Sequence, residues 1–485
     1  MRLPTWGPAA MATFLLVPCA CGGLGVRPAD RPASDGGSEA QTSDGGDAAA
    51  GGCATKWPGI AGGGPPPCEG VDGGVYLCGA PLPFSPTGDG FGLSVVVASG
   101  DPARLSTRVR AAGTAAWGGA LAPTVRAADT AEWQVSGLGP GTRYEYEIRS
   151  SEIAADTPLA SGSVVTQRRP GEPFTFAMIS DTHIGPDGDY LNQGDWCTLA
   201  AVAAQVGAAT PDFVVNLGDM LDFHEFGFNE APPDGSFTGT AYRNYRALLG
   251  DTLGHAAHYA VIGNWEGENG YAPAEVIAQS REQRMLYVPG PTPSTYPESG
   301  SLYQDYYAFT WGDALLVVLN VMTYTTTEHL LSSDPGRPDD WTLGEAQLAW
   351  FADTLAGSHS RWKLVLIHHA VGGAAGDAED SAYGRGGGQA AYVGEQATVH
   401  RLMLQYGAQI FFYGHDHVFT DLQVDGIHYS EPGSAGAIWM FGTARTGYQQ
   451  AWQLSGWGQV TVGPSTLTVR FYARDGTMLY TYTLG

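Results

Sequence analysis

Hydrophobic and polar residues alternate along the chain from residue 91 to about residue 167. The runs LSVVVAS, TRVRA, AEWQV and YEYEIRS each have a period of two, and Gly, Pro and Asp turns separate them. Alternation of this kind is typical of strands that bury one face. The pattern therefore predicts a small all-β sandwich over residues 86–168.

From about residue 173 the pattern changes to apolar runs that alternate with stretches of helical spacing. The apolar runs FTFAMIS, DFVVN, HYAVI, ALLVVLN, WKLVLI and QIFFY predict buried strands, and the tail 459–484 predicts two or three antiparallel strands. Strands that alternate with helices indicate an α/β fold, here over residues 172–485. Asp195 is suited to cap the first helix. The predicted helices cover residues 196–208, 345–356 and 395–406.

The first 21 residues have the pattern of an export signal. Arg2 supplies a positive charge, and the apolar stretch that follows is shorter than the roughly 20 residues that a membrane-spanning helix needs. Small residues and cysteines come next, so the segment resembles a bacterial lipoprotein signal. Ala20 favours Cys21 over Cys19 as the lipidated residue, and plain secretion is the alternative. We expect an exported protein that is extracellular, periplasmic or held at the bacterial cell surface by a lipid anchor.

Residues 22–85 predict a flexible tether that leads into a connector. The tether is rich in Gly, Ala, Ser and Asp, and such a composition buries too little apolar surface to offset the entropy of ordering. An even number of cysteines in an exported protein indicates disulfides, and three pairings of four cysteines are open. The cysteines beyond the signal are Cys53, Cys68, Cys78 and Cys197.

The balance of charge is strongly acidic. The formal net charge is −25 at pH 7, and the chain has only 24 Lys and Arg residues. Binding to a nucleic-acid backbone needs clustered cations, so we do not expect a nucleic acid as partner. The acidity is instead expected to keep an exported protein soluble.

Five short segments place metal-type ligands directly after apolar runs. Ligands of open α/β sheets bind beyond the carboxyl ends of the strands, so these segments are expected to converge. Asp, Asn and His suit metals such as Mn, Zn and Fe, and the absence of Cys argues against a site for soft metals. The segments are Asp181-Thr182-His183, Gly218-Asp219, Gly263-Asn264, His368-His369 and Gly414-His415-Asp416-His417.

In this order, the segments resemble the D-x-H, G-D-x-x-D, G-N-H-D/E, H and G-H-x-H motifs of the calcineurin-like metallophosphoesterase superfamily. The resemblance covers residues 173–485 and implies an α/β/β/α sandwich. The segment LGPGTRY at 138–144 resembles the corner of a fibronectin type III domain, in which a tyrosine hydroxyl bonds back to nearby backbone. The spacing favours Tyr144 over Tyr146 for this role. A fibronectin-like domain before the α/β domain resembles the layout of purple acid phosphatases.

The resemblance implies the ligands of two metal ions, which we expect to be Fe, Mn or Zn. Asp219 would bridge the two ions, because a carboxylate has two oxygens. His369 is the alternative to His368, and Asp222 is expected to lie behind the ligands. The first ion would be held by Asp181, His183, Asp219 and His417, and the second by Asp219, Asn264, His368 and His415.

Two departures separate this chain from true purple acid phosphatases. Those enzymes have a tyrosine ligand where this sequence has Asp222, and a glycine where it has His183. We therefore do not expect a coloured iron–tyrosinate centre.

Trp265 stands where the superfamily has a histidine that stabilises the transition state or protonates the leaving group. Indole has a single donor and no useful acidity, and the loss of a general acid costs about 10²–10⁴-fold in rate. Phosphodiesters and activated monoesters are therefore expected to be better substrates than alkyl monoesters. His369 and Arg385 are the predicted replacements for the missing histidine, with His224, His329 and Tyr383 as further candidates.

These features together predict an exported phosphoesterase that hydrolyses small phosphate mono- or diesters through a metal-bound hydroxide. One alternative is a protein that binds metal or phosphate without turnover, because Trp265 replaces the catalytic histidine. A second alternative is a cell-surface adhesion protein that uses the β-sandwich. The sequence carries no signal for a particular oligomeric state.

Overall fold

The computed structural model describes residues 74–153, 157–186, 194–223, 236–326, 342–369, 394–437, 440 and 450–485. The predicted export signal and the tether up to residue 73 lie outside this part of the chain. No helix among the described residues is long and apolar enough to cross a membrane.

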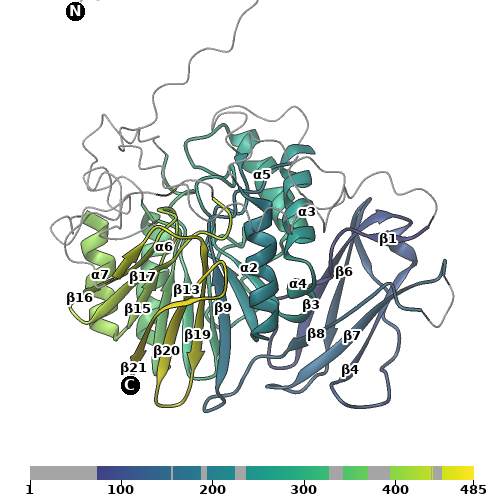
Figure 1. Cartoon of the computed structure of the whole chain (residues 1–485), viewed down its shortest axis with the longest axis horizontal. Coiled ribbons are helices and arrows are strands. Elements are labelled where there is room, and N and C mark those ends of the chain that lie inside the picture. The colour runs from purple at the N-terminus through teal and green to yellow at the C-terminus, as the bar shows by residue number, and fades with distance from the viewer. Residues whose placement is uncertain are drawn as a thin grey trace, which may run out of the picture. The chain divides into compact units, whose positions relative to one another are not determined.

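Two sheets pack face to face in the N-terminal part and form the β-sandwich that the alternating runs predict (Figure 1). Buried side chains such as Leu93, Trp133 and Ile148 fill the space between them. The short helix η1 (Pro102–Arg104) leads into the second sheet. The first sheet has β1 (Tyr76–Leu77), β2 (Leu82–Phe84), β3 (Gly90–Ser99), β5 (Thr124–Ala127) and β6 (Thr130–Ser136), and the second has β4 (Leu105–Ala111), β7 (Arg143–Ser150) and β8 (Ala160–Val165).

The sandwich begins before residue 86, which was the predicted boundary. Strands β1 and β2 lie within the predicted connector, and both pair with β3. Strand β2 also pairs in parallel with β11 (Ala257–Ala260), where Phe84 lies opposite His258. The run Leu82-Pro83-Phe84 is too short to be recognised from alternation, and its neighbours in the sheet define it as a strand. The first sheet of the sandwich is therefore continuous with a sheet of the α/β part.

Two tyrosines of β7 make hydrogen bonds, one within the sandwich and one to the α/β part. The backbone N–H of Gly139 donates to the hydroxyl of Tyr144 at 2.8 Å, as the resemblance of this corner implies. Tyr146 faces the other way, is fully buried, and donates to the carbonyl of Gly254 at 2.7 Å. Gly254 lies in α4 (Asp251–His255), so this bond joins the two parts.

The C-terminal part contains two large sheets with helices outside them. The first of these continues into the first sheet of the sandwich. It has 11 strands in the order β21-β20-β19-β9-β10-β11-β2-β3-β6-β5, with β1 paired to β3. It adds β9 (Phe174–Ile179), β10 (Phe213–Asn216), β19 (Gly456–Val462), β20 (Leu467–Ala473) and β21 (Met478–Leu484) to the strands given above.

The second sheet has seven strands in the order β12-β13-β14-β15-β17-β16-β18. Its core strands β13, β14, β15 and β17 are parallel. The strands are β12 (Tyr307–Trp311), β13 (Ala314–Val318), β14 (Trp362–Leu366), β15 (Ile410–Phe412), β16 (Phe419–Val424), β17 (Ile427–Pro432) and β18 (Gln450–Trp452).

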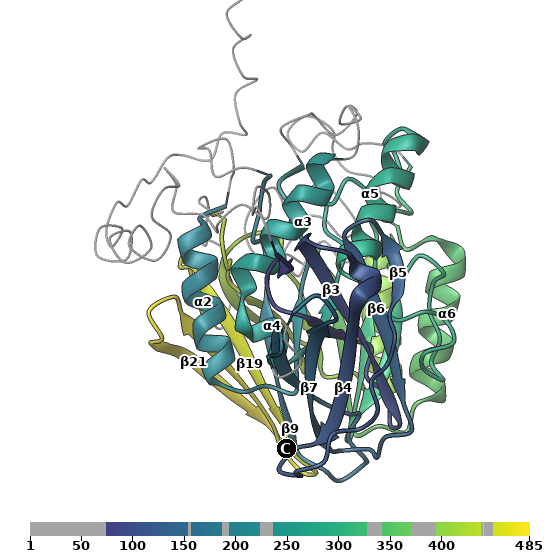
Figure 2. The same ribbon diagram turned by 90° about the vertical axis from the view of Figure 1, so that its right-hand side faces the viewer.

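Side chains of the buried strands point alternately to the two faces of each sheet, so the sheets pack against each other on one face and against helices on the other. The result is four layers. In β9, Phe176 and Met178 face the core between the two sheets, whereas Ala177 and Ile179 face a helical layer. Helices α2 (Trp196–Ala208), α3 (Ser236–Leu249), α4 and α5 (Ala274–Tyr287) lie on the side of the first sheet, and α6 (Gly344–Gly357) and α7 (Gly394–Tyr406) pack on the second. Figure 2 shows α2 and α6 on opposite sides of the sheets. The predicted α/β/β/α sandwich is confirmed.

The predicted elements agree closely with the observed ones. Helix α2 spans residues 196–208, and the carboxylate of Asp195 accepts the backbone N–H of Cys197 at 3.0 Å as its cap. The tail forms three antiparallel strands. Cys78 and Cys197 are both disulfide-bonded, while Cys53 and Cys68 lie outside the described residues.

Candidate metal centre

The predicted ligands follow strands of both sheets at their carboxyl ends. Strands β9, β10 and β11 of the first sheet end just before Asp181, Asp219 and Asn264. Strands β14 and β15 of the second sheet end just before His368 and His415. Because these strands run parallel within their sheets, their carboxyl ends meet at one edge of the fold.

The first group of ligands is fully assembled. Asp181, His183, Asp219 and His417 are buried, and one potential ligand atom of each lies within 4.8 Å of the others. The Nε2 atoms of His183 and His417 are 3.2 Å apart. The Nε2 of His417 also lies 3.4 Å from Asp181 Oδ1. These are the four residues that the resemblance implies for the first ion.

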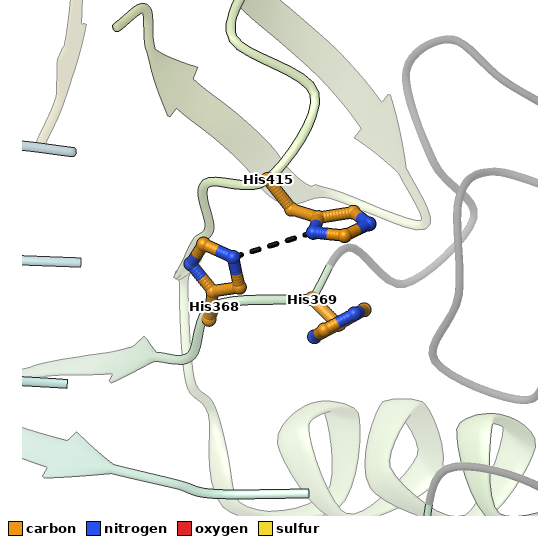
Figure 3. A group of neighbouring side chains, drawn as sticks. All are labelled: His368, His369 and His415. Carbon is orange, nitrogen blue, oxygen red and sulfur yellow. Dashed lines mark hydrogen bonds between the residues drawn. The ribbon is translucent and has the colours of Figure 1, made fainter. Parts of the chain in front are cut away.

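A second group consists of His368, His369 and His415, whose potential ligand atoms also lie within 4.8 Å of one another (Figure 3). The Nδ1 of His415 is 3.3 Å from His368 Nε2 and 2.8 Å from Asn264 Oδ1. Asn264 and His415 therefore lie together as implied. His369 lies beside His368 and His415. The sequence left two roles open for it, as a metal ligand in place of His368 or as a catalytic group.

Asp219 lies between the two groups. Its Oδ2 is 3.1 Å from His368 Nε2 and 3.6 Å from His183 Nε2. Its other oxygen, Oδ1, accepts the backbone N–H of Trp265 at 2.9 Å. This position suits the predicted bridging role, because one carboxylate faces an imidazole from each group.

Most of these residues are held in an unfavourable backbone conformation. Ten non-glycine residues of the described part have positive φ, and five of them are predicted ligands. Left-handed backbone costs a non-glycine residue roughly 1–2 kcal/mol, so half of this backbone strain in the described residues lies at the candidate metal centre. The five are Asp181 (φ 53°), His183 (47°), Asp219 (51°), His415 (81°) and His417 (60°).

The glycines of the motifs allow the ligand loops to approach one another. A Cβ on Gly218, which has a φ of 107°, would lie 2.5 Å from His368 Nδ1. A Cβ on Gly414 would lie 2.1 Å from Ser180 Oγ. Only a residue without a side chain fits at either position.

Hydrogen bonds to the backbone orient the ligands. His368 Nδ1 lies 2.9 Å from the carbonyl of Leu217, and this acceptor holds a proton on Nδ1 and leaves Nε2 as the nitrogen that can bind a metal. The backbone N–H of His415 donates to Asp181 Oδ1 at 3.0 Å. The ligands are thus fixed by parts of the chain that come from both sheets.

Two buried glutamates, which the sequence interpretation did not include, support the ligand loops. The carboxylate of Glu266 accepts the backbone N–H groups of Gly263 at 2.5 Å and Met220 at 2.6 Å, so it joins the second and third motifs. Burial, and then the nearby Asp219, raise the pKa of Glu266 to about 8. The third motif of the superfamily, G-N-H-D/E, ends in an acidic residue, and this position could have identified Glu266 from the sequence.

Glu431 supports the loop of the last motif in the same way. It lies in β17, is fully buried, and accepts the backbone N–H of Val418 at 3.4 Å. Burial, and then Asp416, raise its pKa well above the usual value. No sequence signal identified it, because it occupies an ordinary strand position.

The charges of the imidazoles and carboxylates shift one another's pKa values. Burial by itself would raise the pKa of Asp181, but His417, His368 and His183 hold it at about 2. Burial raises the pKa of Asp219. Burial would lower the pKa of His368, but Asp219 and Asp181 raise it to about 9. Positive charge is therefore favoured between these groups, where a bound cation would replace the protons.

The donor set fits divalent metal ions. The Nε2 atoms of His183 and His417 face each other at 3.2 Å, a contact that is satisfied by a proton on one of them or by a cation between them. Carboxylate and imidazole are the ordinary ligands of Zn, Mn and Fe. The residues thus suit the metals that the resemblance implies.

Trp265 packs against the first group rather than presenting a titratable side chain. Its side chain is 8% exposed, and its ring lies edge to face with His183 at a centroid distance of 5.0 Å. Asp222 is buried but belongs to neither group. The other candidates for a catalytic role, His224, His329, Tyr383 and Arg385, lie outside the described residues.

Comparison with known proteins agrees with this architecture. The family model of the calcineurin-like phosphoesterases matches residues 174–419. No curated protein matches the sequence. The solved structure described as that of PhoD has a TM-score of 0.62 and 16% sequence identity, and the alignment covers 85% of this chain and 91% of that chain. At this identity the likeness shows a shared fold.

Two further solved structures are less similar. GAP50, the anchor in the inner membrane complex of Plasmodium, has a TM-score of 0.37 and 14% identity, covering 64% of this chain and 88% of that chain. A predicted phosphoesterase from Streptococcus pneumoniae TIGR4 has a TM-score of 0.26 and 14% identity, covering 64% of this chain and 98% of that chain. Neither adds to the argument.

Proposed function

The chain belongs to the calcineurin-like phosphoesterase family, and from this premise we propose that it is a metal-dependent hydrolase of phosphate mono- or diesters with two metal ions. The observation that carries the proposal is the position of Asp219. Its carboxylate lies between one group of buried ligands and a second group of buried imidazoles. A bridging carboxylate is what a two-metal hydrolase requires.

The first ion would be held by Asp181, His183, Asp219 and His417. The second would be held by Asp219, Asn264, His368 and His415. Fe, Mn and Zn are the metals that suit these donors. Ions bound there would polarise the phosphoryl group and lower the pKa of bound water.

The chain's own residues orient these donors and shield them from water. Glu266 and the carbonyl of Leu217 fix the ligand loops and the His368 ring. Trp265 covers one side of His183 and offers no proton to a departing oxygen. Substrates whose leaving group needs no protonation, such as aryl phosphates and phosphodiesters, are therefore the proposed substrate class.

Metal analysis combined with two assays tests the proposal. We expect the full-length protein to bind two ions per chain and to hydrolyse bis(4-nitrophenyl) phosphate or 4-nitrophenyl phosphate. Asp219→Asn should lose metal and activity together, because both groups use this carboxylate. His359→Asn is the control, since His359 is exposed and belongs to neither group.

The replacement at Trp265 motivates a second candidate function. A protein with the same metal cradle but no general acid could bind metal or phosphate without turnover. Two bound ions with no hydrolysis of either ester would support this candidate against the enzyme. A protein that binds no metal would contradict both and favour the adhesion role of the β-sandwich.

We also propose that the protein acts outside the cytoplasm, as a secreted or lipid-anchored phosphoesterase. This proposal rests on the pattern of residues 1–21 and on the composition of the tether. Cell fractionation of the full-length protein, and of a Cys21→Ser variant, tests it. Lipid anchoring predicts that only the unsubstituted chain stays with the membrane fraction.

A further inference from the structure

His369 lies where a third imidazole would complete the second metal site. We infer that His369 is a further ligand of the second ion, beside His368, His415, Asn264 and the shared carboxylate of Asp219. This inference rests on the proposed two-metal function, and it changes the ligand set that the family motifs imply, in which only one histidine of the fourth motif binds metal.

The three rings form a compact group (Figure 3). The ring centroids of His369 and His415 are 4.0 Å apart, and those of His368 and His369 are 5.2 Å apart. A nitrogen of each histidine lies within 4.8 Å of a nitrogen of the other two. Two ligands that contact one ion at about 2.0–2.1 Å lie at most about 4.2 Å apart. The His368 and His415 nitrogens, 3.3 Å apart, already have this spacing, and a small shift brings the His369 nitrogen to it.

The end of strand β14 explains how adjacent histidines reach the same site. Consecutive side chains of a strand point to opposite faces, so His369 would point away from His368 if the strand continued. The strand ends at Leu366, and the chain bends at residues 368 and 369. This bend places both rings on the side of His415.

The state of the rings also favours a cation among them. His368 Nδ1 faces the carbonyl of Leu217, which leaves Nε2 as the nitrogen that can bind a metal. Nε2 lies 3.1 Å from Asp219 Oδ2 and 3.3 Å from His415 Nδ1. His415 Nδ1 in turn faces the acceptor oxygen of Asn264 at 2.8 Å. A metal ion satisfies several converging acceptors at once, whereas one shared proton satisfies two.

Burial argues against the alternative role of His369 as a replacement general acid. Its side chain is only 1% exposed. A general acid must reach the oxygen that it protonates, within about 2.6–3.2 Å or through one water. Two of its ring contacts are with the candidate ligands His368 and His415.

The two sites then differ in chemical character. The first group has two carboxylates and two imidazoles, whereas the second has three imidazoles, the shared carboxylate of Asp219 and the amide oxygen of Asn264. Imidazole-rich sites suit Zn²⁺, and carboxylate-rich sites suit harder ions such as Mn²⁺. The second site therefore suits Zn²⁺, and the first site suits a harder ion better than the second does.

Zinc titration of the purified full-length protein against a chromophoric chelator tests this inference. We expect two equivalents of Zn²⁺ in the unsubstituted chain. In His369→Ala and His369→Gln, the second equivalent should bind more than 100-fold more weakly while the first is unchanged. Loss of a group that only orients a ligand typically costs about 10–100-fold in affinity, so the size of the effect separates a ligand from a positioning residue.

Cobalt substitution supplies a second readout that does not depend on activity. The visible spectrum of Co²⁺ in the second site should change in both His369 variants, because one nitrogen donor is lost. His428→Ala is the matched control, since His428 is a similarly buried histidine that pairs with Asp421 away from both groups. Its zinc affinity and cobalt spectrum should match those of the unsubstituted chain.

The outcomes distinguish the inference from the proposed function. An unchanged second equivalent and an unchanged cobalt spectrum in both variants would overturn the role of His369 and leave the phosphoesterase proposal intact. A chain that binds two ions with the expected His369 effect but hydrolyses no ester would overturn only the proposed activity. A chain that binds fewer than two ions would overturn the inference. Circular dichroism identifies a variant that fails to fold, and the conservative Gln variant then decides.

Discussion

Trp265 is the residue that most limits the chemistry of this site. The backbone N–H of Trp265 supports Asp219, so the loop itself has the geometry of its motif. Only the side chain departs from the superfamily pattern, and it packs against His183. The departure therefore concerns the proposed proton transfer rather than the positions of the predicted ligands.

We predict that Trp265→His raises the turnover of an alkyl phosphate monoester, toward the about 10²–10⁴-fold that a positioned general acid supplies. The gain should be smaller for aryl esters, whose leaving groups need no proton. Steady-state kinetics with both substrates and metal analysis measure the effect. Trp265→Phe is the control, because it keeps an aromatic ring without an acid. A fall in activity with metal retained would show that the indole itself has a catalytic role.

Gly218 is the second residue whose identity the site depends on. Its φ is positive, and an added Cβ would lie 2.5 Å from His368 Nδ1. We predict that Gly218→Ala weakens metal binding, because the His368 ring must shift to make room. Gly426→Ala is a matched control, since Gly426 also has positive φ but no atom within 4 Å of the added Cβ.

Gly426→Ala should lose roughly 1–2 kcal/mol of stability through backbone strain, measured by urea unfolding. Gly218→Ala should lose more, because its added Cβ would also lie 2.9 Å from the backbone nitrogen of Gly263. Only Gly218→Ala should lose metal affinity, measured by competition with a chelator. Equal metal affinity in the two variants would show that the His368 ring tolerates the added methyl group.

At the scale of elements, a buried network connects a ligand loop to helix α3. The side-chain oxygen of Asn216 accepts the backbone N–H of Gly218 at 2.9 Å, and its amide donates to the hydroxyl of Tyr245 at 2.9 Å. Tyr245 then contacts His258 Nε2 at 2.7 Å. The network therefore joins β10, α3 and β11 beneath the loop that carries Asp219.

Burial, and then the positive charge of Arg246, lower the pKa of His258 to about 3. An unfolded histidine titrates near 6.5, so between pH 6.5 and 3 the unfolded chain binds a proton that the folded chain does not. This residue therefore lowers the free energy of unfolding as the pH falls through that range, by up to about 1.4 kcal/mol per pH unit. Above pH 6.5 it has no such effect.

We predict that His258→Gln reduces this slope in urea unfolding measured from pH 7 to pH 4. The exposed His359 provides the control, and His359→Gln should keep the slope of the unsubstituted chain. Equal slopes for all three proteins would mean that His258 is already protonated in the folded state.

At the scale of the whole described chain, a buried arginine joins the sandwich to the α/β part. Arg246 of α3 donates to the carbonyl of Ser94 at 2.9 Å in the sandwich, and to the carbonyl of Tyr287 at 3.1 Å at the end of α5. Its side chain is fully buried. Together with the bond from Tyr146 to Gly254, it fixes the shared sheet at the point where β2 meets β11.

We predict that Arg246→Met lowers the free energy of unfolding by about 3 kcal/mol, because each buried carbonyl left without a donor costs about 1–3 kcal/mol. Chemical unfolding measures the change. Arg104→Ala is the control, since Arg104 is exposed and its ion pairs contribute about 0–1 kcal/mol. A loss below 1 kcal/mol for Arg246→Met would show that the carbonyls find other donors.

The local pattern was sufficient for most elements. Alternation and helical spacing identified the sandwich, α2 with its Asp195 cap and the three C-terminal strands, because these signals depend only on neighbouring residues. Strand β2 was missed because three residues carry no period, and its partners are distant in sequence. The continuity between the two parts was missed for the same reason.

The sequence by itself determined the type and order of the ligand motifs, because ligands at the ends of buried strands must meet at one edge of the sheets. It also determined the replacement of an acid by Trp265, since chemical identity does not depend on the fold. Only the tertiary structure decided that His369 lies with His368 and His415, that Glu266 and Glu431 support the loops, and that the ligands take left-handed backbone. These features arise from chain bends and from contacts between distant segments, which no local pattern encodes.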